Sequence, residues 1–166
     1  MKEQLFPSPA SRFLKALRRL EYHYNGKGIY HRILLPCAYY RWYRLSHTTG
    51  ISIAKNVCEK GLTIPHHGSI VVNAACRIGE NCMIQNNVNI GANGGSMKAP
   101  QIGRDVYIGP GAVIFGDITI ADGCYIGANA VVNKSFTEPN SVIVGVPAKV
   151  IKYDSVHWWE KNGLKR

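Results

Sequence analysis

Aliphatic residues recur at every sixth position through much of the chain. Starting at Val72, each step of six meets Ile or Val, and after one interruption the steps resume at Ile102 and run to Val132. These anchors are Val72, Ile78, Ile84, Ile90, Ile102, Ile108, Ile114, Ile120, Ile126 and Val132. Gly follows five of the ten, where we expect it to let the chain turn tightly. A period of six suits neither a helix nor a long strand, so it predicts short strands separated by turns.

A second set of small or apolar residues lies two positions before the anchors, which is the alternation of a β-strand. Its members are Ile70, Cys76, Cys82, Val88, Val106, Ala112, Ile118, Cys124 and Ala130. No rung of this size could bury its apolar side alone, so the pattern predicts an all-β solenoid of stacked coils. The three cysteines in the set are then small buried hydrophobes and not nucleophiles or ligands.

Two departures from the period mark where chemistry is expected. The step that leads to Val72 is eight residues long, and its widened turn holds His66 and His67. Between the fourth and fifth anchors the phase is kept, but residues 92–101 are rich in Gly, Ser and Pro and predict a loop. The two departures can approach one another only if the coils stack.

The first 48 residues do not follow the repeat and predict helices. Ser11 is expected to cap a helix with an apolar face and basic residues elsewhere. A second apolar and aromatic stretch, residues 29–45, carries arginines between its aromatic residues, and Pro36 breaks its apolar face. This basic extension either docks on anionic lipid or a lipid-linked acceptor, or caps the first coil. We favour the cap, because the ends of a solenoid need covers.

Composition and charge narrow the possible functions. The 46% hydrophobic and 18% charged residues exclude disorder, no run approaches a membrane span, and the start does not resemble a signal peptide. We therefore expect a cytoplasmic protein, with peripheral contact at the inner face of the membrane as the alternative. The net charge of +10 divides into +7 for residues 1–50, zero for 51–148 and +3 for 149–166, which argues against a central groove for nucleic acid.

Four segments of the repeat carry a resemblance to a known family. They are residues 102–103 (IG), 108–112 (IGPGA), 126–132 (IGANAVV) and 145–149 (GVPAK). They resemble the hexapeptide-repeat acyltransferases, whose fold is a left-handed parallel β-helix. Residues 61–72, GLTIPHHGSIVV, are similar to the serine acetyltransferases and to their shorter relatives in surface-polysaccharide gene sets.

The resemblance implies a left-handed parallel β-helix of hexapeptide repeats with a short N-terminal helical extension. We expect the extension over residues 1–48, the acyltransferase domain over 49–151 and a C-terminal tail over 152–166. The tail residues His157, Trp158 and Trp159 are expected to pack on the last coil. Because the family places its active sites between neighbouring β-helices, the resemblance also implies a homotrimer.

The resemblance implies acetyl-CoA as co-substrate and His66, six residues before Val72, as the general base, with His67 as its neighbour. Histidine suits this task because its ordinary pKa lies near neutrality. The implied contacts to coenzyme A are Gly91, Ala92, Gly109, Pro110, Ala128, Lys134 and Lys149. Family members carry Ala or Ser at the position of Pro110, and the backbone N–H of that residue donates a hydrogen bond to pantetheine. Because Pro110 has no N–H, this bond goes to the Pro110 carbonyl instead or is lost.

The chain departs from the serine acetyltransferases where they recognise the acceptor. Pro65 precedes the histidine where they carry an aspartate, Gly50 lies near the place of a second, orienting aspartate, and Ala99 replaces a loop histidine. We therefore expect O-acetyl transfer to a sugar hydroxyl of a surface polysaccharide or its precursor, by direct attack. Serine O-acetyltransferase is the alternative, and a non-catalytic structural β-helix is the alternative of another class.

No metal site is expected. The five cysteines contain no CxxC pair, and the repeat region holds only the adjacent His66 and His67, whereas a zinc-dependent β-helix hydratase would need three histidines.

Overall fold

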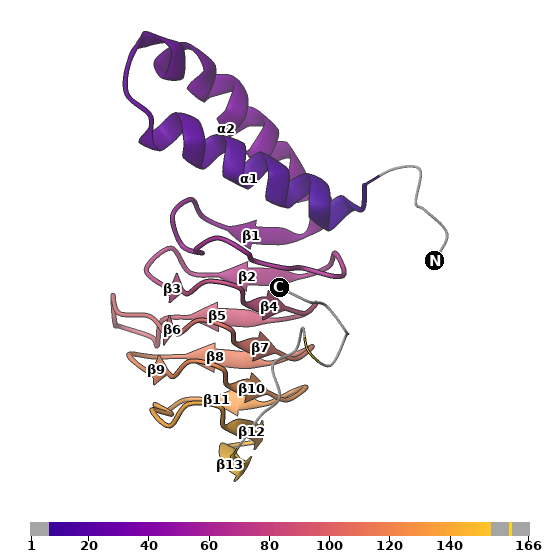
Figure 1. The fold of residues 1–166 in the computed structure, drawn as a ribbon, viewed down its shortest axis with the longest axis vertical. Helices are drawn as coiled ribbons and strands as arrows, with labels where there is room; N and C mark the ends of the chain where they lie inside the picture. The colour runs from indigo at the N-terminus through magenta and orange to yellow at the C-terminus, as the bar shows by residue number, and fades with distance from the viewer. Residues whose placement is uncertain (1–6, 154–159, 161–166) are drawn as a thin grey trace.

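The structure is a computed structural model that describes residues 7–153 and 160. Within these residues two helices precede thirteen short strands (Figure 1). The helices are α1 (Pro9–Asn25) and α2 (Ile29–Thr49). The strands are β1 (Ile51–Ile53), β2 (Ile70–Val72), β3 (Arg77–Ile78), β4 (Met83–Ile84), β5 (Asn89–Gly91), β6 (Gln101–Ile102), β7 (Tyr107–Ile108), β8 (Val113–Phe115), β9 (Thr119–Ile120), β10 (Tyr125–Ile126), β11 (Val131–Val132), β12 (Val142–Gly145) and β13 (Ala148–Lys152).

The strands form three sheets, and successive coils of the chain add one rung to each. The first sheet has the order β1-β2-β5-β8-β11, the second has β3-β6-β9, and the third has β4-β7-β10-β12 with β13 at its edge. All pairs are parallel except β12 with β13. Figure 1 shows the three sheets as three columns of strands. The expectation of short strands in stacked coils is confirmed.

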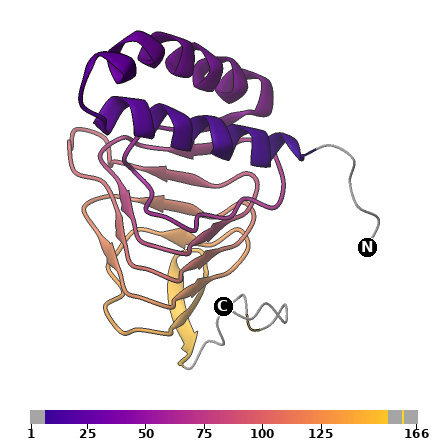
Figure 2. The same cartoon turned by 45° about the horizontal axis from the view of Figure 1, so that its top comes forward.

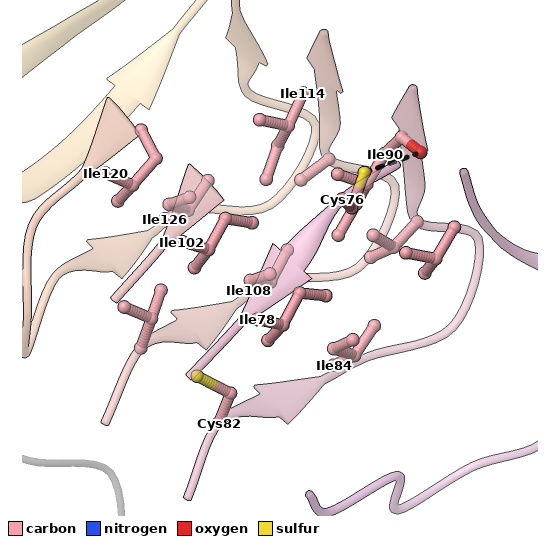
Figure 3. Packing of buried hydrophobic residues seen from close by; sticks show 14 of the residues in the cluster. Cys76, Ile78, Cys82, Ile84, Ile90, Ile102, Ile108, Ile114, Ile120 and Ile126 are labelled. Carbon is pink, nitrogen blue, oxygen red and sulfur yellow. Dashed lines mark hydrogen bonds between the residues drawn. The ribbon is translucent and has the colours of Figure 1, made fainter. Parts of the chain in front are cut away.

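The core is a stack of the predicted anchors. All ten anchors are at most 4% exposed, and the second set of inward residues is at most 6% exposed. Figure 3 shows how anchors of successive coils lie over one another, as Ile78, Ile102 and Ile120 do in the second sheet. The buried positions of Cys76 and Cys82 are confirmed, since both thiols face this core. Replacing one such anchor by Ala typically costs about 2–5 kcal/mol.

The glycines that follow the anchors serve a different purpose from the one the sequence suggested. None of the five has a positive φ, so they do not make the tight turns. At four of them a Cβ would instead lie within 2.8 Å of an atom of the next coil. These four are Gly79, Gly103, Gly109 and Gly127. Left-handed turn positions are taken instead by other glycines, such as Gly111, and by Asn, as at Asn87 and Asn129, a residue that tolerates this conformation.

Helix α1 begins earlier than expected. Its N-cap is Ser8, whose hydroxyl accepts a hydrogen bond from the Ser11 backbone N–H at 3.2 Å. The prediction that Ser11 caps the helix is therefore wrong. Pro9 explains the shift, because its fixed φ suits the first helical position and it needs no hydrogen-bond acceptor there.

Helix α1 covers the first coil with its apolar face. Ala10, Phe13 and Leu17 have no exposed surface and belong to the same core cluster as Ile51 and Ile53 of β1. Figure 2 shows α1 lying across the end of the solenoid. The interpretation of the N-terminal segment as a cap is confirmed for this helix.

Polar contacts fix α1 to the same coil. The Arg18 guanidinium donates to the Cys58 carbonyl at 2.8 Å and to the Glu59 carbonyl, and it pairs with Glu21 at 2.7 Å. Glu21 also accepts from the Asn56 backbone N–H at 2.8 Å. Because Glu21 is 8% exposed, its charge needs both partners.

Helix α2 packs on α1 and runs without interruption past Pro36 to Gly50, whose φ of 72° ends it. Pro36 therefore lies inside the helix without ending it. Pro36 and Arg32 are both exposed, so water can bond the Arg32 carbonyl that loses its intrahelical donor. Trp42 joins α2 to the first coil through a 3.2 Å hydrogen bond to the Ile53 carbonyl. Neither helix in the described part of the chain has the length and apolar character that a membrane span requires.

Candidate active site

The chain passes from the third sheet to the first at one corner of every coil, and these turns lie in a column. We call this column the His66 corner, and it comprises residues 49–50, 65–69, 86–87, 109–111 and 127–129. Backbone hydrogen bonds link its levels, from Gly111 N–H to the Asn86 carbonyl at 3.0 Å and from Asn129 N–H to the Pro110 carbonyl at 2.9 Å. These hydrogen bonds hold the turns of the His66 corner in fixed positions relative to one another.

The widened turn with His66 lies at the top of this corner, between the first two coils. Its backbone is held by the end of α2, since Gly68 N–H donates to the Thr49 carbonyl at 3.2 Å and Ile70 N–H donates to the Gly50 carbonyl at 3.0 Å. A Cβ on Gly50 would lie 3.1 Å from the Gly68 carbonyl oxygen, so the helix end and the turn are in close contact.

The side chains of His66 and His67 are both exposed. Among the described residues, none forms a hydrogen bond or an ion pair with His66. In the described part of the chain no carboxylate pairs with this imidazole, and Gly50 brings only backbone to the position where an orienting aspartate was considered. The imidazole is thus open to solvent on the outside of the corner.

Three expected coenzyme A contacts share the His66 corner. Gly109 is buried and donates to the Ile126 carbonyl at 2.8 Å, while Ala128 is exposed beside it. Pro110 already uses its carbonyl to accept from Asn129. The bond to pantetheine that was expected at this carbonyl could therefore use only its second lone pair.

The other expected contacts lie elsewhere in the chain. Gly91 ends β5 at the opposite side of the first sheet and Ala92 follows it, and Lys134 lies at the same side two coils further on. The Lys134 ammonium lies 5.5 Å from the centroid of the Phe136 ring. Lys149 is exposed on β13. Within one chain these residues do not form one pocket with His66.

The two departures from the repeat are also separated. The His66 turn precedes β2, whereas the loop at residues 92–101 follows β5, so they occupy opposite ends of the first sheet. Stacking of the coils does not bring them together within one chain. In the loop, Met97 is 91% exposed, but Ala99 is only 2% exposed and belongs to the core.

A pair of stacked tyrosines was missed by the sequence analysis. The rings of Tyr107 and Tyr125 lie parallel on the outer face of the third sheet, with centroids 4.2 Å apart and planes 10° apart. Burial, with Tyr125 adding, raises the pKa of Tyr107 to about 12. The signal was available, since both residues directly precede an anchor and are paired in register one coil apart.

Metal binding finds no support in the described residues, which contain no group of three or more His, Cys, Asp or Glu side chains placed to hold an ion.

Three parallel sheets built from coils with an Ile or Val at every sixth position define a hexapeptide-repeat solenoid. Residues 99–134 match the family model described as bacterial transferase hexapeptide (six repeats). The chain resembles the hexapeptide-repeat acyltransferases, as its motifs suggested, and the serine acetyltransferases in particular.

Curated relatives and solved structures carry this resemblance. The chain is 38% identical over 109 residues to the serine acetyltransferase of Staphylococcus xylosus, covering 64% of this chain and 50% of that protein. It is 39% identical over 106 residues to that of Mycobacterium tuberculosis, covering 62% and 46%. The chain thus spans about half the length of the curated relatives that it matches.

Two crystal structures of serine acetyltransferase from Brucella abortus are similar in fold. One superimposes with a TM-score of 0.72 at 26% identity, covering 89% of this chain and 60% of that one. The other, a complex with coenzyme A, gives a TM-score of 0.72 at 28% identity and covers 86% and 55%.

Proposed function

We propose that this protein is an O-acetyltransferase that moves acetyl from acetyl-CoA to a hydroxyl group, with His66 as general base. The observation that supports this proposal most is that His66 is exposed and has no partner among the described residues, on a turn that the end of α2 and the His66 corner hold in place. The imidazole takes the proton of the acceptor hydroxyl while the oxygen of that hydroxyl attacks the thioester carbonyl. The C–S bond then breaks, and the leaving thiolate of coenzyme A takes up the proton.

The spacing of the coils supports this assignment. Rungs of a sheet lie about 4.8 Å apart, so the Gly109 and Pro110 level lies roughly 10 Å from the His66 turn along the solenoid. An extended pantetheine arm laid along the corner would pass both levels with its thioester beside His66. Lys134 and Lys149 then remain as candidates for the phosphates at the nucleotide end.

The overall organisation that we propose follows the family. The coils form a left-handed parallel β-helix over residues 49–151, after a helical extension over 1–48 and before a tail over 152–166. The tail residues His157, Trp158 and Trp159 lie outside the described residues. The reaction is assigned to the cytoplasm, where acetyl-CoA is made and used.

We further propose a homotrimer whose sites lie between chains. The outer face of the third sheet is apolar, with Met83, Tyr107, Tyr125 and Val142, and the outer face of the first sheet mixes Val71, Val113 and Val131 with Ser52 and Asn89. The outer face of the second sheet is polar, with Arg77, Gln101 and Thr119. Two faces that carry apolar residues and one that carries none suit a ring in which each chain has two neighbours. A neighbouring chain could then supply the loop that this chain keeps away from its own His66.

The leading acceptor is L-serine, because the relatives and the similar structures are serine acetyltransferases. They back serine better than the sugar hydroxyl that the sequence suggested. A sugar hydroxyl remains the second candidate acceptor. Pro65 and Ala99 stand where the serine acetyltransferases carry an aspartate and a histidine that recognise the charged groups of serine, and Ala99 is buried in the core. A neutral hydroxyl acceptor would need no such groups.

The test measures release of free coenzyme A thiol from acetyl-CoA with L-serine, and with a panel of free and nucleotide-linked sugars, by the full chain. We expect saturable turnover with L-serine above hydrolysis without acceptor. Turnover with sugars alone would transfer the assignment to the second candidate. No turnover and no binding of acetyl-CoA would leave a structural solenoid. Sedimentation of the same preparation should give three chains per particle, and an active monomer would contradict the shared site.

A further inference from the structure

The two helices enclose a groove that the proposed reaction does not use. Its volume is about 820 Å³, and its walls combine arginines from both helices with apolar side chains. Arg12 and Arg19 come from α1, and Arg41 and Arg44 come from α2. Leu34 and Ala38 supply apolar surface between them. A groove of this composition suits a ligand with an anionic group and a hydrocarbon part.

The positive charge of the groove is not neutralised by the described part of the chain. None of the four ion pairs found there involves a groove arginine. Residues 9–49 contain eight Lys and Arg but a single carboxylate, and that carboxylate, Glu21, is bound to Arg18. The hairpin therefore has a net formal charge of +7, which attracts anions and repels a second copy of itself.

A buried histidine in the groove wall lacks a partner. His23 is 4% exposed, lines the groove, and its Nδ1 forms no hydrogen bond with any described residue. Buried polar atoms of this kind almost always have a partner, so this one points to a missing ligand. Burial, with His31 and Arg19 adding, lowers the pKa of His23. A bound anion would offset the repulsion from those two neighbours and accept a hydrogen bond.

An apolar stripe on α2 runs beside the groove. Ile29 is 70% exposed, Ile33 is 64% exposed and Tyr40 is 59% exposed. At 100° per residue these three fall within about 40° of one another around the helix, next to the residues that line the groove. Exposed apolar and tyrosine side chains that flank cationic residues are typical of surfaces that lie in the headgroup layer of a membrane.

We propose that the α1–α2 hairpin docks the protein on a bilayer that contains anionic phospholipid. The groove arginines and His23 bind a lipid phosphate, while Ile29, Ile33 and Tyr40 enter the headgroup layer. Figure 2 shows why this geometry is open to a membrane, since the hairpin of α1 and α2 forms one end of the molecule. The inference concerns binding alone and does not depend on the proposed reaction.

The test compares partitioning of the full chain onto vesicles of phosphatidylcholine and onto vesicles that also contain phosphatidylglycerol. The groove variant is Arg12→Gln/Arg41→Gln. The matched control is Lys15→Gln/Arg32→Gln, which removes the same charge from the same helices but from residues that do not line the groove. We expect binding only to the anionic vesicles, weakened about thirtyfold by the groove variant and less than threefold by the control.

A third variant, Ile33→Ser, should also weaken binding, and its exposed position leaves folding intact. Helicity and thermal unfolding of each variant check the fold, and acetyl-CoA turnover is measured separately so that loss of docking is not confused with loss of catalysis. Equal binding to neutral vesicles, or an equal loss in the groove variant and the control, would overturn the proposal. Binding of soluble glycerol phosphate by a protein that binds no vesicles would also overturn the proposal, because the ligand would then be a free phosphate and not a membrane.

Discussion

Replacing Gly109 by Ala should damage both the fold and the binding of acetyl-CoA. The new Cβ would lie 2.8 Å from three backbone atoms of the next coil, including Ala128 N and the Ile126 carbonyl oxygen, where ordinary contacts begin at 3.4 Å. These atoms cannot turn aside, because the Gly109 N–H is bound to the same carbonyl. Overpacking of this kind costs about 2 kcal/mol, which lowers the Tm of a chain of this size by about 4–8 °C.

Two control variants separate the effects. Gly79→Ala meets Arg104 N at 2.6 Å in a different corner, so it should lower the Tm similarly and leave acetyl-CoA binding intact. Gly94→Ala meets nothing within 4 Å and should leave both unchanged. Scanning calorimetry gives the Tm, and titration calorimetry with acetyl-CoA gives the affinity. If Gly109→Ala kept full affinity, or Gly79→Ala lost it as well, the His66 corner would not hold the pantetheine arm.

Two further predictions concern His66 and the thiols. His66→Ala should lower turnover by about 10²- to 10⁴-fold while calorimetry still detects acetyl-CoA binding, and His67→Ala should be milder; an active His66→Ala enzyme would move the base elsewhere. Burial raises the pKa of Cys58 and Cys82 to about 12, so at pH 8 an alkylating reagent should label the exposed Cys37 first, and rapid labelling of a buried thiol would contradict the core described above. Since these thiols keep their protons in the folded state and lose them near pH 9 when unfolded, urea unfolding should show stability falling from pH 9 towards 12.

The solenoid could be predicted because its information is local and repeated. An aliphatic residue at each anchor position, such as Ile84 or Ile108, by itself indicates that the position is buried. Ten anchors that agree on one period of six favour a single fold over its alternatives. The helix ends could not be placed as well, because Ser8 and Ser11 both suit a cap and only the structure shows which one is used. The sequence analysis assigned Gly109 to a tight turn, whereas the structure shows that it allows close packing against the next coil. That contact joins residues far apart in the sequence, so no local pattern reveals it.

The candidate site was predicted only in part for a related reason. His66 stood out because the widened turn interrupts a regular pattern, but whether the loop at 92–101 lies beside it depends on which corner each departure occupies. A full coil takes three hexapeptides, as the pairing of Val113 with Val131 shows, so counting repeats in threes would have separated the two corners. The groove between the helices could not be foreseen, because helix packing decides which arginines face one another.

The contact between the end of α2 and the His66 turn makes the helical hairpin and the candidate base one mechanical unit. Thr49 and Gly50 hold the turn directly through Gly68 and Ile70, without any intervening coil. A shift of the last turn of α2 therefore displaces the backbone on either side of the imidazole, while the stacked coils below stay in register. Truncating α2 before Thr49 would remove the two carbonyls that hold the His66 turn, although no side chain of the helix touches it through a hydrogen bond found among the described residues.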